Sequence, residues 1–229
     1  RMRDEGALTP SVHAELVAAP IPFQKGRFQY ESNVVLDEVE ARLSAAPFPA
    51  LFESLNIDNP STAGISIVTT LHEAAQRGGT YGLWHHLTEV GGVMDGVDAS
   101  SFALDSDTRI GFDPSRVMKA RTFHTARGIA SGGSELQLPN GVCTVDREAI
   151  KRASDIIARA RGGNLWARGT SEDVAAIETL IASGKPLMVS LRGQTDEGWV
   201  CDLERRPKLQ GALMVLEGGQ IRAMVGGND

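Results

Sequence analysis

The sequence lacks the features that mark several large classes of protein. It has only two cysteines, Cys143 and Cys201, which are too few for a disulfide-built scaffold and do not have the spacing of metal ligands. Its longest apolar runs are the size of a strand, far below the ~20 residues that a helix needs to cross a bilayer. The charged opening Arg1–Glu5 has no apolar segment behind it, so it is not a signal peptide. No lysine- or arginine-rich run occurs and the formal net charge is −6, so we expect no nucleic-acid partner.

The composition is that of an ordinary soluble globular protein. Hydrophobic residues make up 41% of the 229 residues and charged residues 23%. A chain of this length forms one or two domains with a core of normal size. The two cysteines leave two alternatives open, a disulfide in an oxidising compartment or two buried free thiols.

The last part of the chain predicts a β-hairpin. Residues 212–216 and 220–225 are apolar or alternating, and Gly218-Gly219 between them suits a tight turn because glycine adopts positive φ without strain. An isolated hairpin is only marginally stable in water. Since the sequence stops soon after it, and since Met2 is the second residue, we expect both ends to lie within a longer chain.

The first half predicts mainly helices. Thr9-Pro10 begins a short helix, Asn33 caps a second one, and a third lies around 51–55. The β-branched segment 64–71 predicts a strand that pairs with the terminal hairpin. A helix over 73–90 follows, and the Gly- and Asp-rich run 91–101 indicates a loop.

The second half predicts a β-barrel. Strands are expected at 116–125, 135–138, 142–145, 186–192 and 198–204. Between the third and fourth strands, Asp146 caps one helix, and Thr170 with Asp173 begins another in a capping-box arrangement. Three strands, helices and two strands are typical of the five-stranded OB-type barrel. The expected fold is therefore α+β, with an OB-like β-barrel module inserted into a mixed helix/strand connecting region.

No pattern of residues indicates a catalytic or metal site. His72-Glu73-Ala74-Ala75-Gln76 lacks the second histidine of a zinc-protease helix, and Ser183-Gly184-Lys185 fits a helix end better than a phosphate loop. Aspartates 95, 98, 105 and 107 fit a solvated loop better than a calcium site. Tryptophans 84, 166 and 199 fit core or interface anchors better than a sugar platform. We predict no cofactor and no metal.

The tail resembles a known family. Arg206-Pro207, Leu209–Leu213 and Val215-Leu216, then Gly219, Ile221 and Ala223–Gly227, are similar to the entry into the transpeptidase domain of class A penicillin-binding proteins, the bifunctional peptidoglycan synthases. Three more stretches resemble that family in order and spacing: Gly6–Thr9 with the following helix, 64–76 with His72 in place of the usual Asp, and the β-rich stretch 114–206.

The family's catalytic residues have no counterpart here. Its glycosyltransferase motif is missing, no serine is followed by lysine at the third position, and no Lys-Thr-Gly occurs. By this resemblance the nucleophile lies shortly beyond Asp229. The expected organisation is a connecting region over 1–112, the OB-like module over 113–206, and the first hairpin of the transpeptidase domain over 207–229.

The resemblance implies a non-catalytic interdomain fragment that spaces or regulates two catalytic domains. Its partners would be the adjoining glycosyltransferase and transpeptidase domains, and its location periplasmic, with the parent anchored in the cytoplasmic membrane. An alternative is that the barrel binds glycan or a regulatory protein through Trp166 or Trp199. A further alternative is a complete small enzyme with a metal bound by His72 and His86.

Overall fold

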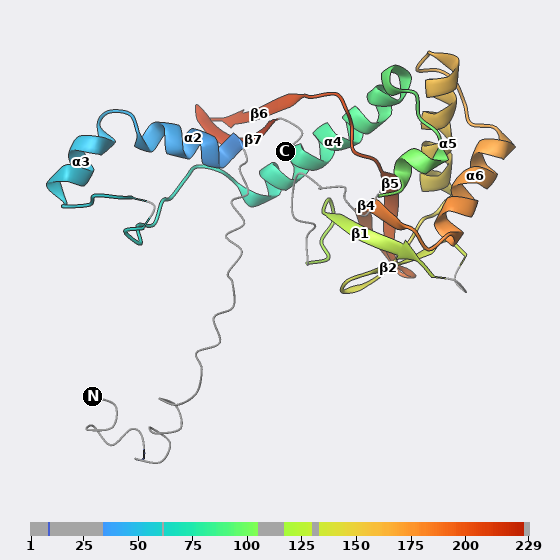
Figure 1. Cartoon of the computed structure of the whole chain (residues 1–229), viewed down its shortest axis with the longest axis horizontal. Helices are drawn as coiled ribbons and strands as arrows, with labels where there is room; N and C mark the ends of the chain where they lie inside the picture. The colour runs from blue at the N-terminus through green and yellow to red at the C-terminus, as the bar shows by residue number, and fades with distance from the viewer. Residues whose placement is uncertain (1–8, 10–33, 61, 105–116, 130–132, 227–229) are drawn as a thin grey trace. The chain divides into compact units, whose positions relative to one another are not determined.

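Short alternating segments in the second half of the chain close into a β-barrel (Figure 1). The computed structural model describes residues 9, 34–60, 62–104, 117–129 and 133–226. The barrel strands, in the spatial order β1-β2-β3-β5-β4, close back onto β1. They are β1 (Phe123–Gly128), β2 (Glu135–Leu138), β3 (Gly141–Thr144), β4 (Pro186–Thr195) and β5 (Gly198–Glu204). Closure leaves no open sheet edge, and the expected α+β class with an OB-like barrel is confirmed.

The pairing of β3 with β5 is parallel, whereas the other barrel pairs are antiparallel. This parallel pair carries both cysteines, and Cys143 and Cys201 form a disulfide with their Cα atoms 5.9 Å apart. Both cysteines are fully buried in the barrel core. Of the two alternatives that the sequence left open, the structure therefore has the disulfide.

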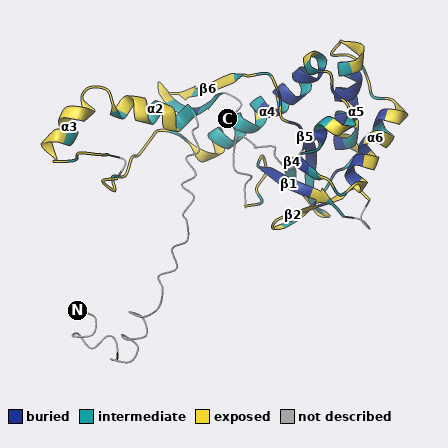
Figure 2. Cartoon of the chain, in the orientation of Figure 1, coloured by how far each residue is buried: buried dark blue, intermediate teal, exposed yellow. Residues whose placement is uncertain are grey.

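Two helices lie between β3 and β4 and complete the core. In α5 (Arg147–Gly162), the Asp146 side chain caps the first turn by accepting a hydrogen bond from Ala149 N at 2.8 Å. In α6 (Ser171–Ala182), Thr170 and Asp173 form the predicted capping box. A hydrogen-bonded ion pair with Arg161 lowers the pKa of Asp173 to about 2. The buried residues gather in the barrel and along these helices (Figure 2).

The remaining elements lie outside the barrel. They are α2 (Val34–Leu43), α3 (Phe48–Ser54), α4 (Glu73–Asp95), the 3-10 helix η1 (Ala99–Phe102), β6 (Ala212–Glu217) and β7 (Gln220–Gly226). The strands β6 and β7 form the predicted hairpin, with Gly218 and Gly219 both at positive φ. No helix among the described residues combines the length and the apolar composition needed to span a bilayer.

Three expectations about secondary structure are wrong, two of them only in their first part. The segment 64–71 is not a strand: only its end reaches β7, where Thr70 Oγ1 donates to Ile221 O and His72 N donates to Arg222 O. Val68 is 93% exposed, so β-branched composition alone does not form a strand without a neighbour along its length. The expected loop over 91–101 is also wrong in its first part, because α4 continues to Asp95.

The tertiary contacts of two glycines explain the longer α4. A Cβ on Gly91 would lie 2.6 Å from the Arg205 guanidinium, and one on Gly92 would lie 2.9 Å from Ile156 of α5. The close packing at these positions outweighs the low helix propensity of glycine. The expected first strand over 116–125 is wrong in its first part, because residues 117–122 are not a strand and β1 begins only at Phe123. Of the expected helix that begins at Thr9, only Thr9 itself is described, and Asn33, Asp105, Asp107 and residue 116 lie outside the described residues.

We predict that reduction of the Cys143–Cys201 bond lowers the free energy of unfolding by about 4 kcal/mol, because the bond closes a loop with a sequence separation of 58 residues. Urea unfolding with and without reductant measures the change. The variant Cys143→Ala/Cys201→Ala is the control and should not respond to reductant. Equal midpoints for the oxidised and reduced protein would contradict the prediction.

Candidate functional site

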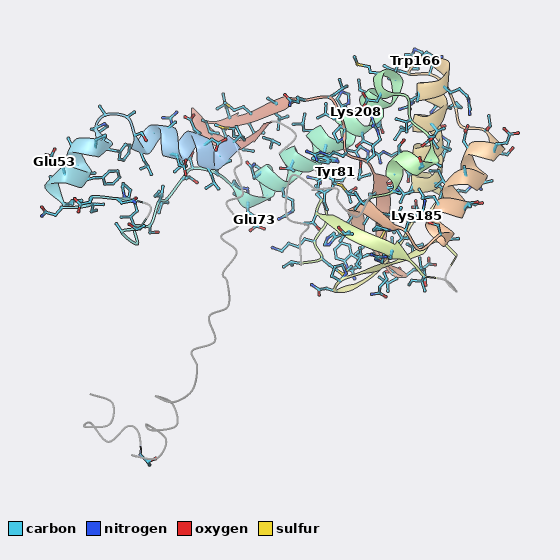
Figure 3. The ribbon with its side chains drawn as sticks, viewed as in Figure 1. Glu53, Glu73, Tyr81, Trp166, Lys185 and Lys208 are labelled. Atoms are coloured by element: carbon cyan, nitrogen blue, oxygen red, sulfur yellow. A yellow bond between two sulfur atoms is a disulfide. The ribbon has the colours of Figure 1, made fainter. Side chains whose placement is uncertain are left out.

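The two tryptophans predicted as a binding surface lie in different environments. Trp166 is 86% exposed in the loop between α5 and α6, and Figure 3 labels it on the α5 side of the chain. Trp199, at the start of β5, is partly buried and packs against the barrel core. No described contact joins the two, so they do not form one platform. Trp84 is 6% exposed and packs on Phe123, as expected of a core anchor.

The histidines proposed as a metal site do not come together. His72 is the N-cap of α4, and His86 lies on an exposed position of the same helix. The separation of 14 residues corresponds to about 21 Å along a helix, too far for one metal ion. Within the described residues, no cluster of His, Cys, Asp or Glu has the arrangement of a metal site. The hypothesis of a His72/His86 metal site is therefore wrong.

A fully buried carboxylate, Glu204 at the end of β5, has partners from three elements. Its side chain is fully buried and contacts Arg152 of α5, with Nη1–Oε1 at 3.3 Å and Nη2–Oε2 at 3.4 Å. Ser190 Oγ of β4 donates to Glu204 at 2.8 Å, and His85 Nδ1 of α4 lies 3.2 Å away. Burial alone raises the pKa of Glu204, but the charge of Arg152 and the bonds from His85 and Ser190 outweigh it, so the net shift lowers this pKa.

The network around Glu204 fixes α4 against the barrel. Arg152 also contacts Glu89 of α4 at 3.2 Å and donates to the backbone oxygen of His85 at 3.3 Å. Glu89 in turn lies 3.6 Å from Arg159 of α5. One buried carboxylate thereby connects side chains from α4, α5 and both long barrel strands. Sequence reasoning missed this network, because its members are far apart along the chain.

The other end of α4 holds the hairpin. Gln76 pairs with Met224 of β7 in two hydrogen bonds, Nε2 to the backbone O at 2.7 Å and backbone N to Oε1 at 2.9 Å. Gly79 lies against the hairpin, since a Cβ there would be 2.8 Å from Leu213 Cδ2 and 3.3 Å from Val225 Cγ2. With 23 residues, α4 is about 35 Å long, so a single helix carries the barrel at one end and the hairpin at the other.

A groove of about 700 Å³ lies where α4 and η1 meet the barrel. Its described lining includes five cationic side chains and one carboxylate: Arg127, Lys185, Arg205, Arg206, Lys208 and Asp95. Figure 3 labels Lys185 and Lys208, which come from the two ends of the β4–β5 region. Lys185 follows Ser183-Gly184, the predicted end of α6, where Gly184 has positive φ. None of these groove cations was a predicted site residue.

Together the fold and the site define an OB-like barrel joined by one long helix to a β-hairpin. No family model matches the sequence, and no curated protein matches it at a significant level. Among solved structures, the chain is similar to penicillin-binding protein 1A from Haemophilus influenzae, with 18% identity and a TM-score of 0.40. The match covers 98% of this chain and 30% of that protein, and a likeness of this degree does not assign a family.

We predict that Glu204→Gln lowers the free energy of unfolding by about 3 kcal/mol, because Arg152 then loses its fully buried carboxylate partner and keeps only the partly exposed Glu89. Urea unfolding measures the loss. Glu217→Gln is the matched control: Glu217 pairs with Arg222 at 2.9 Å but its side chain is 75% exposed. This exposed pair should contribute less than about 1 kcal/mol. Equal losses in the two variants would show that the buried network has no special role.

Proposed function

We propose that the chain is a non-catalytic interdomain region of a bifunctional peptidoglycan synthase and that it sets the spacing of the two catalytic domains. Its parts are the connecting region 1–112, the OB-like module 113–206 and the first hairpin of the transpeptidase domain, 207–229. The parent protein would join glycosyltransferase and transpeptidase activities at the outer face of the cytoplasmic membrane.

The observation that carries this proposal is the double attachment of α4. The Glu204 network holds the helix to the barrel, and Gln76 and Gly79 hold it to the hairpin. A helix that is attached at both ends sets the distance between the barrel and the hairpin by its length, which is what a spacer between two domains requires. The hairpin at the far end is the segment whose sequence resembles the entry to a transpeptidase domain.

Two further features support the proposal. The sequence has no serine followed by lysine at the third position, so this segment carries no transpeptidase nucleophile of the family. The buried Cys143–Cys201 disulfide suits a protein that folds outside the cytoplasm, since structural disulfides persist in oxidising compartments. A periplasmic location is therefore part of the proposal.

We predict that Gly79→Val loosens the hairpin from α4, because the added atoms collide with Leu213 and Val225. Amide hydrogen exchange in β6 and β7 should become faster by about tenfold, while exchange in the barrel stays unchanged. Gly82→Val is the matched control, since a Cβ at Gly82 has nothing within 4 Å and the propensity change in the helix is the same. Similar exchange in both variants would contradict the attachment.

The proposed family predicts that acylation by a β-lactam differs between residues 1–229 and a longer product of the same gene. A labelled β-lactam should not acylate residues 1–229, because no activated serine is present, and should acylate the product of the complete reading frame. Gel fluorescence after denaturation measures the covalent adduct. Acylation of residues 1–229 would contradict the non-catalytic assignment. Absence of acylation in the complete product would contradict the family.

A second function is the binding of glycan or a regulatory protein by the barrel. Trp166 favours this binding function, because its side chain is 86% exposed while backbone hydrogen bonds fix its loop before and after it. On one side Trp166 N donates to Asn164 Oδ1 at 3.0 Å, and on the other Gly169 N donates to Asp155 Oδ1 at 2.8 Å. An exposed tryptophan on a fixed loop is typical of a contact residue.

A further inference from the structure

The basic groove has a charge opposite to that of the chain as a whole. The formal net charge of the protein is −6, yet five of the six charged side chains in the described lining of the groove are cationic. They come from separate elements: Arg127 from β1, Lys185 from the turn before β4, and the others from the segment that follows β5. Only the tertiary fold brings them to one place. A concentration of this kind attracts anions.

The backbone of the barrel sets one wall of the groove. Arg127 is paired with Pro186 across β1 and β4, so Arg127 and Lys185 lie beside each other at one end of this strand pair. Leu104 N donates to Pro186 O at 2.8 Å, and Ala103 forms a bridge with Leu187, which attaches the end of η1 to the same strand. Neither Arg127 nor Lys185 forms an ion pair with a described residue, and both side chains are exposed.

One cation of the groove lining, Arg205, is buried and already paired with a carboxylate, so the contact residues must be the exposed cations. Arg205 is 4% exposed, and its Nη2 lies 2.8 Å from Asp95 Oδ2. The guanidinium fits there because Gly91 has no side chain, as a Cβ would lie 2.6 Å from Nη2. Its buried Nε–H has no hydrogen-bond partner among the described residues. Asp95 therefore holds the guanidinium in place without occupying all its donors.

We propose that this groove binds the carboxylates of a peptide-bearing glycan strand, with Arg127 and Lys185 as the contact residues. Guanidinium and ammonium groups bind carboxylates through charge-assisted hydrogen bonds, and a groove open to solvent accommodates a polymer rather than a buried small molecule. The choice of a glycan strand as ligand rests on the proposed function, whereas the anion site itself rests on the groove. Peptidoglycan stem peptides carry such carboxylates along the strand.

The test is cosedimentation of the chain with purified peptidoglycan sacculi. The wild type should bind, and Arg127→Glu/Lys185→Glu should bind at least about tenfold more weakly, because opposite charges in the groove become like charges. Binding should also fall as salt increases, since the contacts are exposed. Amidation of the sacculus carboxylates should remove the binding of the wild type.

Three controls decide the outcome. Arg147→Glu/Lys119→Glu makes the same charge change at exposed positions outside the groove and should bind as the wild type does. It also removes the exposed Lys119–Glu73 pair, so thermal unfolding checks that each variant is folded. Trp166→Ala should also bind normally. Vesicles of phosphatidylglycerol provide a phosphate surface, to which binding should be weaker.

The proposal is overturned if the wild type does not bind sacculi, or if amidated sacculi bind equally well. The proposal is also overturned if Trp166→Ala loses binding while Arg127→Glu/Lys185→Glu binds like the wild type. Stronger binding to the vesicles than to sacculi overturns it as well. The β-lactam and Gly79 experiments do not involve the groove. A failure of the groove proposal is therefore distinct from a failure of the proposed function.

Discussion

The buried ion pair of Glu204 and Arg152 is the interaction on which the arrangement of the chain depends. A carboxylate with no exposure is unfavourable unless every oxygen has a partner, and here Arg152, Ser190 and His85 supply them. These partners come from α5, β4 and α4, so satisfying one charge fixes three elements at once. Apolar contacts would hold α4 near the barrel, but directional bonds also fix its position along the barrel.

The position of α4 determines the two surfaces on which the proposals rest. At its C-terminal end, Asp95 and Gly91 place the guanidinium of Arg205 under the basic groove. Near its N-terminal end, Gln76 and Gly79 hold the hairpin. The same helix therefore positions both the groove and the hairpin. A spacer that also contacts a glycan strand would align the strand with the domain that follows the hairpin, and this connects the two proposals.

Elements with a strong local signal were predictable from the sequence. Asp146 and Thr170 cap helices because their side chains accept hydrogen bonds from backbone amides a turn ahead, and Gly218-Gly219 forms the turn because both residues adopt positive φ. The expected strand over 64–71 does not form, because a strand needs a neighbour along its length. The helix α4 is longer than its glycines predict, because Gly91 and Gly92 allow close packing, which helix propensity does not describe. The sequence singles out Trp166 and Trp199 as candidate contact residues, but it does not show that they lie in different environments.

By itself the sequence determined which segments become barrel strands and helices and in what succession they follow along the chain, together with the hairpin and the lack of the catalytic motifs of the family it resembles, because these depend on neighbouring residues and on residue identity. The spatial order of the strands and the closure of the barrel came from the structure. The tertiary structure decided which alternatives hold. It brought Cys143 next to Cys201, buried Glu204 beside Arg152, and gathered cations into one groove. Each of these depends on distances between residues far apart in the chain, which only the closed barrel and the packing of α4 and α5 against it fix.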